Sequence, residues 1–158
     1  MTRRYLIPTL AGVAQVVGQT QQSSNRDRLI GTWRLLSLEM MVDGKILYPL
    51  GEHPIGRLTY DAAGRTSAQV MKSGRKSAIK DPSAVARGTE DELRQIADGY
   101  VGYFGSFDVD GSTVTHHIEA CTLPAWTGTD QKRQLEFAGT QLVLRFGPNK
   151  LVWERLPD

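Results

Sequence analysis

The amino-acid sequence predicts a mainly β protein: a single antiparallel up-and-down β-barrel of about eight or nine strands, with one short helix near residues 90–98. Short apolar runs follow one another along most of the chain and are separated by turn signals, which is typical of consecutive hairpins. One helix start stands out, so the crossover helices that parallel strands need are missing from the pattern. The 158 residues are enough for one domain with a core of its own.

The first half of the chain provides four strand candidates, residues 31–42, 45–48, 57–61 and 65–71. Asp43-Gly44 joins the first two, because both residues tolerate the positive φ angles of a two-residue hairpin turn. Ala63-Gly64 turns the chain between the next two. The polar residues 72–87 that follow predict a long loop.

A capping pattern marks the start of the helix. The Thr89 side chain is placed to accept a hydrogen bond from the backbone of Glu92, and the Glu92 carboxylate is placed to reach back. Acidic residues in this first turn also suit the helix dipole. The helix has one apolar face, formed by Leu93, Ile96 and Ala97. Gly99 predicts its end, so the helix is short.

The second half of the chain is more regular. Its strand candidates are residues 103–109, 113–122, 131–138, 141–146 and 151–156. Asp110-Gly111 repeats the hairpin chemistry of the first half, and Gly139-Thr140 joins the third hairpin. Trp126 lies in a Pro- and Gly-containing loop between the second and third hairpins.

Residues 1–28 are interpreted as an N-terminal arm, or a signal peptide followed by a linker, ahead of a barrel domain at 29–158. Arg3 and Arg4 precede an uncharged and mostly apolar run at residues 5–14, and small residues follow as far as Gly18. This outline fits a short secretory signal, which would make the protein periplasmic or secreted. The alternative is a retained arm or short helix packed against the barrel in a cytoplasmic protein. The run is too short for a membrane span.

Composition argues against several classes of partner. The formal net charge is +2, and basic residues are nowhere concentrated with interleaved aromatics, so we expect no nucleic-acid partner. A single cysteine, Cys121, excludes an internal disulfide and a cysteine-based zinc site. His117 and Glu119 could share a metal on one strand face, but the spacing of the other residues demands no such site. We therefore expect neither a metal nor a cofactor, and the sequence makes no prediction about the oligomeric state.

Several motifs resemble, in order, the bacterial and fungal lipocalin-like domain family, a calycin-type barrel. They are Gly31-Thr32-Trp33, Gly56-Arg57-Leu58-Thr59-Tyr60-Asp61, Tyr103-Phe104-Gly105, His116-His117-Ile118-Glu119, Trp126-x-Gly128-Thr129-Asp130 and Leu151-Val152-Trp153-Glu154-Arg155. The resemblance covers nearly everything from residue 29 to the end. It implies a barrel that encloses a cavity, and it implies little about activity. It also implies that Trp33 closes one end of the barrel beneath a basic side chain of the last strand, for which Arg155 is the candidate.

Strand alternation predicts which side chains line the lumen, because successive residues point to opposite faces. On residues 113–122 the apolar face carries His116 inward, together with Val114, Ile118 and Ala120. The predicted ligand-binding residues are His116, Tyr103, Phe107, Tyr60, Leu135 and Phe137, with Arg133 near the mouth and Trp126 as a lid or as a loop anchor.

The predicted function is the binding of a small hydrophobic or amphipathic molecule in the lumen. His116 would orient the ligand by hydrogen bonding, or it is a core histidine satisfied by a neighbouring tyrosine or carbonyl. The alternative is a cofactor-free cyclase or isomerase acting on a polyketide- or terpenoid-like substrate, with His116 as the acid or base and Tyr103 or Tyr60 beside it. A structural protein with a filled lumen is the third possibility.

Overall fold

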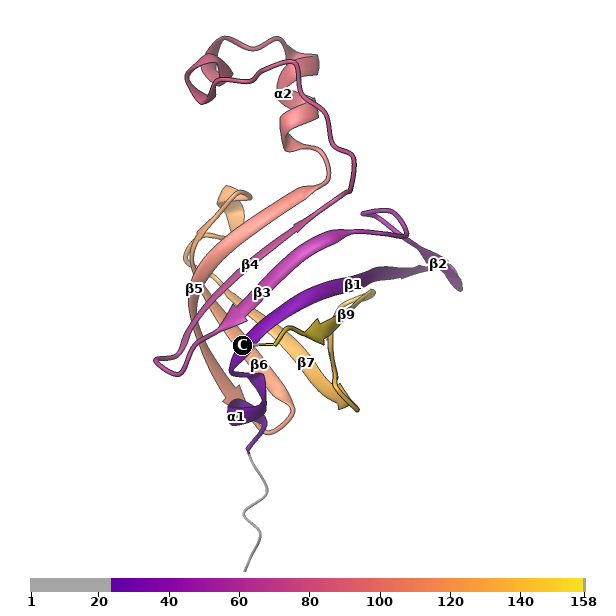
Figure 1. The fold of residues 1–158 in the computed structure, drawn as a ribbon, viewed down its shortest axis with the longest axis vertical. Helices are drawn as coiled ribbons and strands as arrows, with labels where there is room; N and C mark the ends of the chain where they lie inside the picture. The colour runs from indigo at the N-terminus through magenta and orange to yellow at the C-terminus, as the bar shows by residue number, and fades with distance from the viewer. Residues whose placement is uncertain (1–23, 158) are drawn as a thin grey trace, which may run out of the picture.

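The computed structural model describes residues 24–157, and within them one antiparallel sheet of nine strands forms the protein (Figure 1). The elements in chain order, with η for a 3₁₀ helix, are α1 (Asn25–Leu29), β1 (Gly31–Val42), β2 (Lys45–Leu47), β3 (Ile55–Tyr60), β4 (Arg65–Met71), η1 (Pro82–Arg87), α2 (Glu90–Ala97), β5 (Tyr100–Asp110), β6 (Thr113–Cys121), η2 (Pro124–Trp126), β7 (Asp130–Ala138), β8 (Gln141–Phe146) and β9 (Asn149–Arg155).

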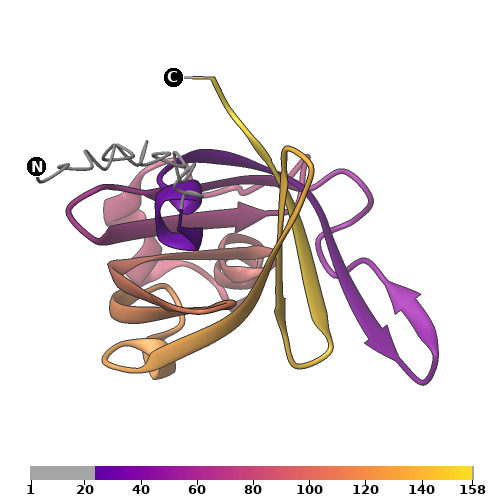
Figure 2. The same cartoon turned by 90° about the horizontal axis from the view of Figure 1, so that it is seen from below.

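Pairing between the first and last strands closes the barrel. The strand order is β2-β1-β3-β4-β5-β6-β7-β8-β9, and β9 also pairs with β1 from Trp33 to Met40. Consecutive strands from β3 onward are neighbours, so the predicted up-and-down antiparallel barrel is confirmed. β2 pairs only with the last residues of β1, and this hairpin extends past the rest of the barrel (Figure 2).

Trp33 closes one end of the barrel, as predicted. It is almost fully buried, and its indole N–H donates to the Leu29 carbonyl at 2.9 Å. The Arg155 guanidinium lies 4.3 Å from the centre of the Trp33 ring. Arg155 also donates to the Ile30 carbonyl at 2.6 Å, and to the Arg28 carbonyl. One side chain of the last strand therefore holds both the Trp33 ring and the chain that leads into β1.

The short helix α1 lies at this closed end and was not predicted. Ser24 caps it: the Ser24 side chain accepts from the Asp27 backbone, and the Asp27 carboxylate accepts from the Ser24 backbone. This is the same capping box that identified α2, in the last part of the segment interpreted as a linker. The helix buries Leu29 completely beneath Trp33.

The segment between β4 and β5 extends from the opposite end of the barrel (Figure 1). It contains α2, which begins after Thr89 with the predicted capping box and runs from Glu90 to Ala97. The polar stretch ahead of it is not all loop, because η1 lies within it. Lys72 forms an ion pair with Asp98 at 2.9 Å, which ties the end of α2 to the end of β4.

A β-bulge interrupts the pairing of β5 with β6. Gly105 pairs with Ile118 and Phe104 pairs with Ala120, which leaves Glu119 without a partner in β5. A side chain at Gly105 would collide with the His117 carbonyl, so the close approach of β6 explains this glycine. The bulge reverses the alternation beyond it. Ala120 therefore lies opposite the exposed Phe104, and the expectation that Ala120 faces the lumen was wrong.

Candidate functional site

A cavity of about 100 Å³ lies inside the barrel, toward the end opposite Trp33. Its wall comes from β1, β3, β4, β5, β7, β8, β9 and η2. Most of the lining is apolar and consists of Leu38, Leu58, Ala68, Val70, Val101, Leu144, Phe146 and Leu151. Four larger polar-tipped side chains complete it, namely Tyr103, Trp126, Arg133 and Trp153. The site is therefore a small apolar chamber with a few polar groups, the usual make-up of a ligand pocket.

Arg133 is the most unusual of these residues, because a long cationic side chain is only 5% exposed. Its guanidinium lies 3.9 Å from the centre of the Phe146 ring and 5.8 Å from that of Trp126. One of its N–H groups donates to the Lys132 carbonyl at 3.1 Å. Within the described part of the chain, none of the ion pairs involves Arg133. Aromatic faces, in place of a carboxylate, stabilise the buried charge.

His116 is fully buried between two tyrosines beside the cavity. Its Nε2 lies 2.7 Å from the Tyr60 hydroxyl, and its Nδ1 lies 2.8 Å from the Tyr103 hydroxyl. Both ring nitrogens are therefore used, and of the three residues Tyr103 alone lines the cavity. His116 acts on the cavity through the orientation of Tyr103.

Burial keeps this trio neutral. Desolvation lowers the pKa of His116 to about 3, and the nearby positive charge of Arg133 acts in the same direction. Desolvation also raises the pKa of Tyr103 to about 12, against an opposing effect of Arg133. Desolvation likewise raises the pKa of Tyr60 well above its ordinary value. At neutral pH the trio consists of an imidazole and two phenols, so its hydrogen bonds are those between uncharged groups.

A model of the lipocalin-like domain matches residues 30–155, nearly the whole of the described chain. The chain belongs to the lipocalin-like domain family. It is also similar to the 4'-hydroxy-3'-methoxypropiophenone carrier protein ppsC of Aspergillus oryzae, with 34% identity over 86 residues that span 49% of this chain and 76% of that protein. Among solved structures it resembles an uncharacterized protein from Bacteroides eggerthii, with 12% identity, a TM-score of 0.45, and coverage of 81% of this chain and 99% of that one.

The residues predicted to line the lumen of this lipocalin-like barrel divide into two groups. Tyr103, Arg133 and Trp126 line the cavity. The others lie in the packed interior next to it: His116, Tyr60, Phe107, Leu135 and Phe137. Phe107 packs edge-on against Tyr60 with ring centres 4.7 Å apart, and Phe137 lies 6.2 Å from Trp33. Alternation therefore indicates which side chains point inward, and the position along the strand decides which of them reach the open space.

Trp153 is the main lining residue that sequence reasoning missed. It is 2% exposed, and its indole nitrogen has no hydrogen-bond partner among residues 24–157. The signal was available, because Leu151 and Trp153 alternate on β9 as apolar residues do when they face a core. Trp126, predicted as a lid or as a loop anchor, forms part of the cavity wall, and its ring centre lies 6.4 Å from that of Tyr103.

His117 lies outside the barrel and does not pair with Glu119. Its Nδ1 lies 2.6 Å from a carboxylate oxygen of Asp130, and its Nε2 lies 3.0 Å from one of Asp108. These two carboxylates raise the pKa of His117, with Asp130 the larger influence. Across residues 24–157 no group of three or more His, Cys, Asp or Glu side chains could hold a metal ion, and no helix there is long and apolar enough to cross a membrane.

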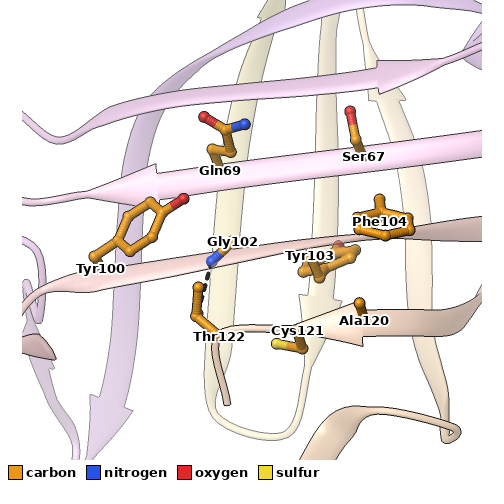
Figure 3. Close-up of a pocket in the computed structure, with 9 residues that line it drawn as sticks. All are labelled: Ser67, Gln69, Tyr100, Gly102, Tyr103, Phe104, Ala120, Cys121 and Thr122. Atoms are coloured by element: carbon orange, nitrogen blue, oxygen red, sulfur yellow. Dashed lines mark hydrogen bonds between the residues drawn. The ribbon is translucent and has the colours of Figure 1, made fainter. Parts of the chain in front are cut away.

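A second hollow, of about 360 Å³, lies over strands β4 to β6 (Figure 3). The side chains of Tyr100 and Phe104 flank it, and Gly102 forms its base. The Gly102 N–H donates to the Thr122 hydroxyl at 3.0 Å. Phe104 is 54% exposed, so this hollow opens on the outer surface of the barrel, and Tyr103 borders both it and the internal cavity.

Proposed function

We propose that this protein binds one small, largely apolar molecule in the barrel cavity and acts as its carrier. The apolar cavity in the barrel interior, above the packed floor, carries the proposal. A core that served stability alone would be filled, because interiors pack about as densely as organic crystals and voids cost stability. Here the void lies among leucine and aromatic side chains, which suit an apolar guest.

The size of the cavity limits the ligand. Its volume is about 100 Å³, whereas pockets for drug-sized molecules hold about 300–1,000 Å³. An apolar cavity of about 150 Å³ engineered into another protein admits benzene. Because the cavity is smaller than this, even a single ring with a short substituent requires some rearrangement of its wall. A larger one would have to displace Trp126, the wall residue that belongs to a short connection between β6 and β7.

The Aspergillus relative supports a carrier role. Its name describes a carrier of 4'-hydroxy-3'-methoxypropiophenone, a single aromatic ring with a short ketone chain. A molecule of this class resembles the cavity lining in its mixture of apolar and polar atoms, and its size would require the wall to open.

Titration of the protein with acetophenone and with ethylbenzene tests the proposal, with the three indole N–H resonances as reporters. Trp126 and Trp153 line the cavity, whereas Trp33 lies at the closed end. We expect saturable shifts of the first two resonances and little change in the third. Ala68→Leu adds three carbon atoms to the cavity wall and should abolish the shifts. Ala138→Leu makes the same change at an exposed site of β7 and should leave them intact. Failure of both compounds to bind the wild-type protein would refute the proposal.

The alternative function, a cofactor-free cyclase or isomerase, is favoured by one observation. His116 has a second polar residue, Tyr103, within hydrogen-bonding reach at 2.8 Å, and Tyr103 lines the cavity. In such an enzyme Tyr103 would touch the substrate and His116 would position it. Incubation of the wild-type protein with small polyketide-like ketones, followed by product analysis, distinguishes the two functions. A carrier returns the compound unchanged, and an enzyme forms a product that Tyr103→Phe abolishes.

A further inference from the structure

The hydrogen-bond chain beside the cavity has one satisfactory orientation. Tyr60 is 1% exposed, and its hydroxyl has a single partner among the described residues, His116 Nε2. A buried hydroxyl hydrogen needs an acceptor, so the Tyr60 O–H donates to Nε2. The imidazole is neutral, and its one N–H therefore sits on Nδ1 and donates to the Tyr103 oxygen. The Tyr103 hydrogen is then left free to be donated into the cavity that Tyr103 lines.

Two further donors border the same space. The Trp153 indole N–H is buried and has no partner within residues 24–157. An indole nitrogen can donate and cannot accept. Arg133 carries five N–H donors; its side chain donates to the Lys132 carbonyl and also interacts with the Tyr103 hydroxyl, which leaves several donors for a guest. A buried polar group left without a partner costs stability, and the Trp153 indole N–H is such a group. Tyr103 and Arg133 each have a partner and keep further donor capacity beside the same cavity.

The side chains that line the cavity include few hydrogen-bond acceptors. Among the residues that line it, all of them in the described part of the chain, there is no Asp, Glu, Asn, Gln, Ser, Thr or His. Tyr103 provides the one hydroxyl oxygen, and that oxygen already accepts from His116. The side chains of the wall therefore offer hydrogen-bond donors and a positive charge to a guest, and no free acceptor.

We propose, building on the proposed carrier function, that the cavity selects single-ring ligands that carry an acceptor oxygen, a carbonyl or a carboxylate, held by Tyr103, Arg133 and Trp153. The ring would occupy the apolar part among Leu58, Leu144 and Leu151, and the oxygen would face the donors. A ligand with a cationic substituent is disfavoured, because its charge would lie beside the buried positive charge of Arg133. Charge-assisted hydrogen bonds from Arg133 favour the anionic members of the class.

A matched ligand series tests this selectivity by titration calorimetry of the full chain at pH 7. The probes are ethylbenzene, acetophenone, benzoate and benzylamine, which share one ring and differ in the substituent. We expect acetophenone and benzoate to bind at least about tenfold more tightly than ethylbenzene, and benzylamine not to bind. The Trp153 indole N–H resonance should move downfield with acetophenone, as a newly donated hydrogen bond requires, and much less with ethylbenzene.

Three variants separate recognition from a structural role. Arg133→Met keeps the length of the side chain and removes its donors, so benzoate should lose at least about tenfold in affinity while ethylbenzene loses little. Tyr103→Phe removes one hydroxyl and should weaken acetophenone by about five- to tenfold. The control is Leu144→Ala, which alters the apolar part of the same wall and removes no donor. It should weaken all ligands alike and preserve their affinity ratios.

The outcomes distinguish the two proposals. If ethylbenzene binds as tightly as acetophenone and benzoate, the carrier function stands and the acceptor selectivity is refuted. If Arg133→Met weakens every ligand by the same factor, Arg133 supports the cavity structurally and the selectivity is again refuted. If none of the probes binds the wild-type protein, both proposals fail.

Discussion

Replacing His116 by glutamine should make the fold less sensitive to acid. The folded protein holds His116 neutral between two phenols, with a pKa lowered to about 3 from the ordinary value of 6.5. Between these two values the unfolded chain binds a proton at this histidine and the folded chain does not. The free energy of unfolding therefore falls as the pH drops below 6.5, and the loss is complete near the folded pKa.

The magnitude follows from the two pKa values. One pKa unit corresponds to about 1.4 kcal/mol, and between pH 7 and pH 5 the unfolded histidine passes from mostly neutral to almost fully charged. His116 should therefore remove about 2 kcal/mol of stability over this interval, a large part of the total for a domain whose stability is about 5–15 kcal/mol. Below pH 5 the carboxylates also titrate, which makes the interval above it the cleaner one.

Urea unfolding at a series of pH values measures this effect in wild type, His116→Gln and His117→Gln. The His116→Gln curve should lie flatter than the wild-type curve by about 2 kcal/mol between pH 7 and pH 5, whatever its absolute stability. His117→Gln is the matched control with the opposite sign. The pKa of His117 is raised, mainly by Asp130, so its contribution is present at low pH and lost as the pH rises through that pKa. Its removal should steepen the loss of stability on acidification.

Parallel curves for wild type and His116→Gln would refute the reasoning. An NMR titration of the imidazole resonances provides the direct test in the unmutated protein. The His116 ring should show no titration above pH 5, whereas the His117 ring should titrate above its ordinary pKa. A His116 resonance that titrates near pH 6.5 would mean that the buried tyrosine–histidine chain opens to solvent in the native state.

Two further predictions concern the scaffold. Arg155→Ala should lower the free energy of unfolding in urea by about 2 kcal/mol, because it removes the stacking on Trp33 and the hydrogen bond to the Ile30 carbonyl. Arg155→Lys should restore only part of this stability, since an ammonium lacks the planar guanidinium fork. Full restoration by lysine would assign the effect to charge alone. Gly105→Ala should lower the free energy of unfolding by about 2 kcal/mol, because the added methyl group would overlap the His117 carbonyl. It should also broaden the NMR amide signals of β5 and β6. A stability equal to that of the wild type would show that the bulge can shift freely.

Much of the architecture could be predicted because hairpin signals act locally. Asp43-Gly44 and Asp110-Gly111 fix turns from a few neighbouring residues, and a chain of hairpins leaves few topologies open. The β5–β6 bulge could not be foreseen, since Gly105 and Glu119 meet only in the folded sheet. Helix α1 was missed although Ser24 and Asp27 form a capping box, because five residues are too few to show a helical period.

The candidate site was predictable to the level of strand faces. The parity of β5, β6 and β7 placed Tyr103, His116 and Arg133 on the inner face, where the structure also has them. The alternation of side chains along a strand does not show how far along the barrel axis a residue lies. His116 therefore looked like the polar group in the pocket, although its ring nitrogens are both taken up by tyrosines and Tyr103 is the residue exposed to the cavity. Trp153 shares the inward parity of Leu151 on β9, and that parity alone does not show that its indole reaches the cavity.

The β1–β9 seam determines how slowly this barrel can assemble. Trp33 pairs with Arg155 across nearly the whole described chain, so the last ladder of the barrel closes only when its two ends meet. Contacts between residues so distant in sequence slow folding, and barrels dominated by such pairings fold in about milliseconds to seconds. Until that seam forms, β1 and β9 each present an unpaired edge to solvent. The floor contact of Arg155 with Trp33 spans this seam, so variants that weaken it should lengthen the time during which the chain is open to edge-to-edge aggregation.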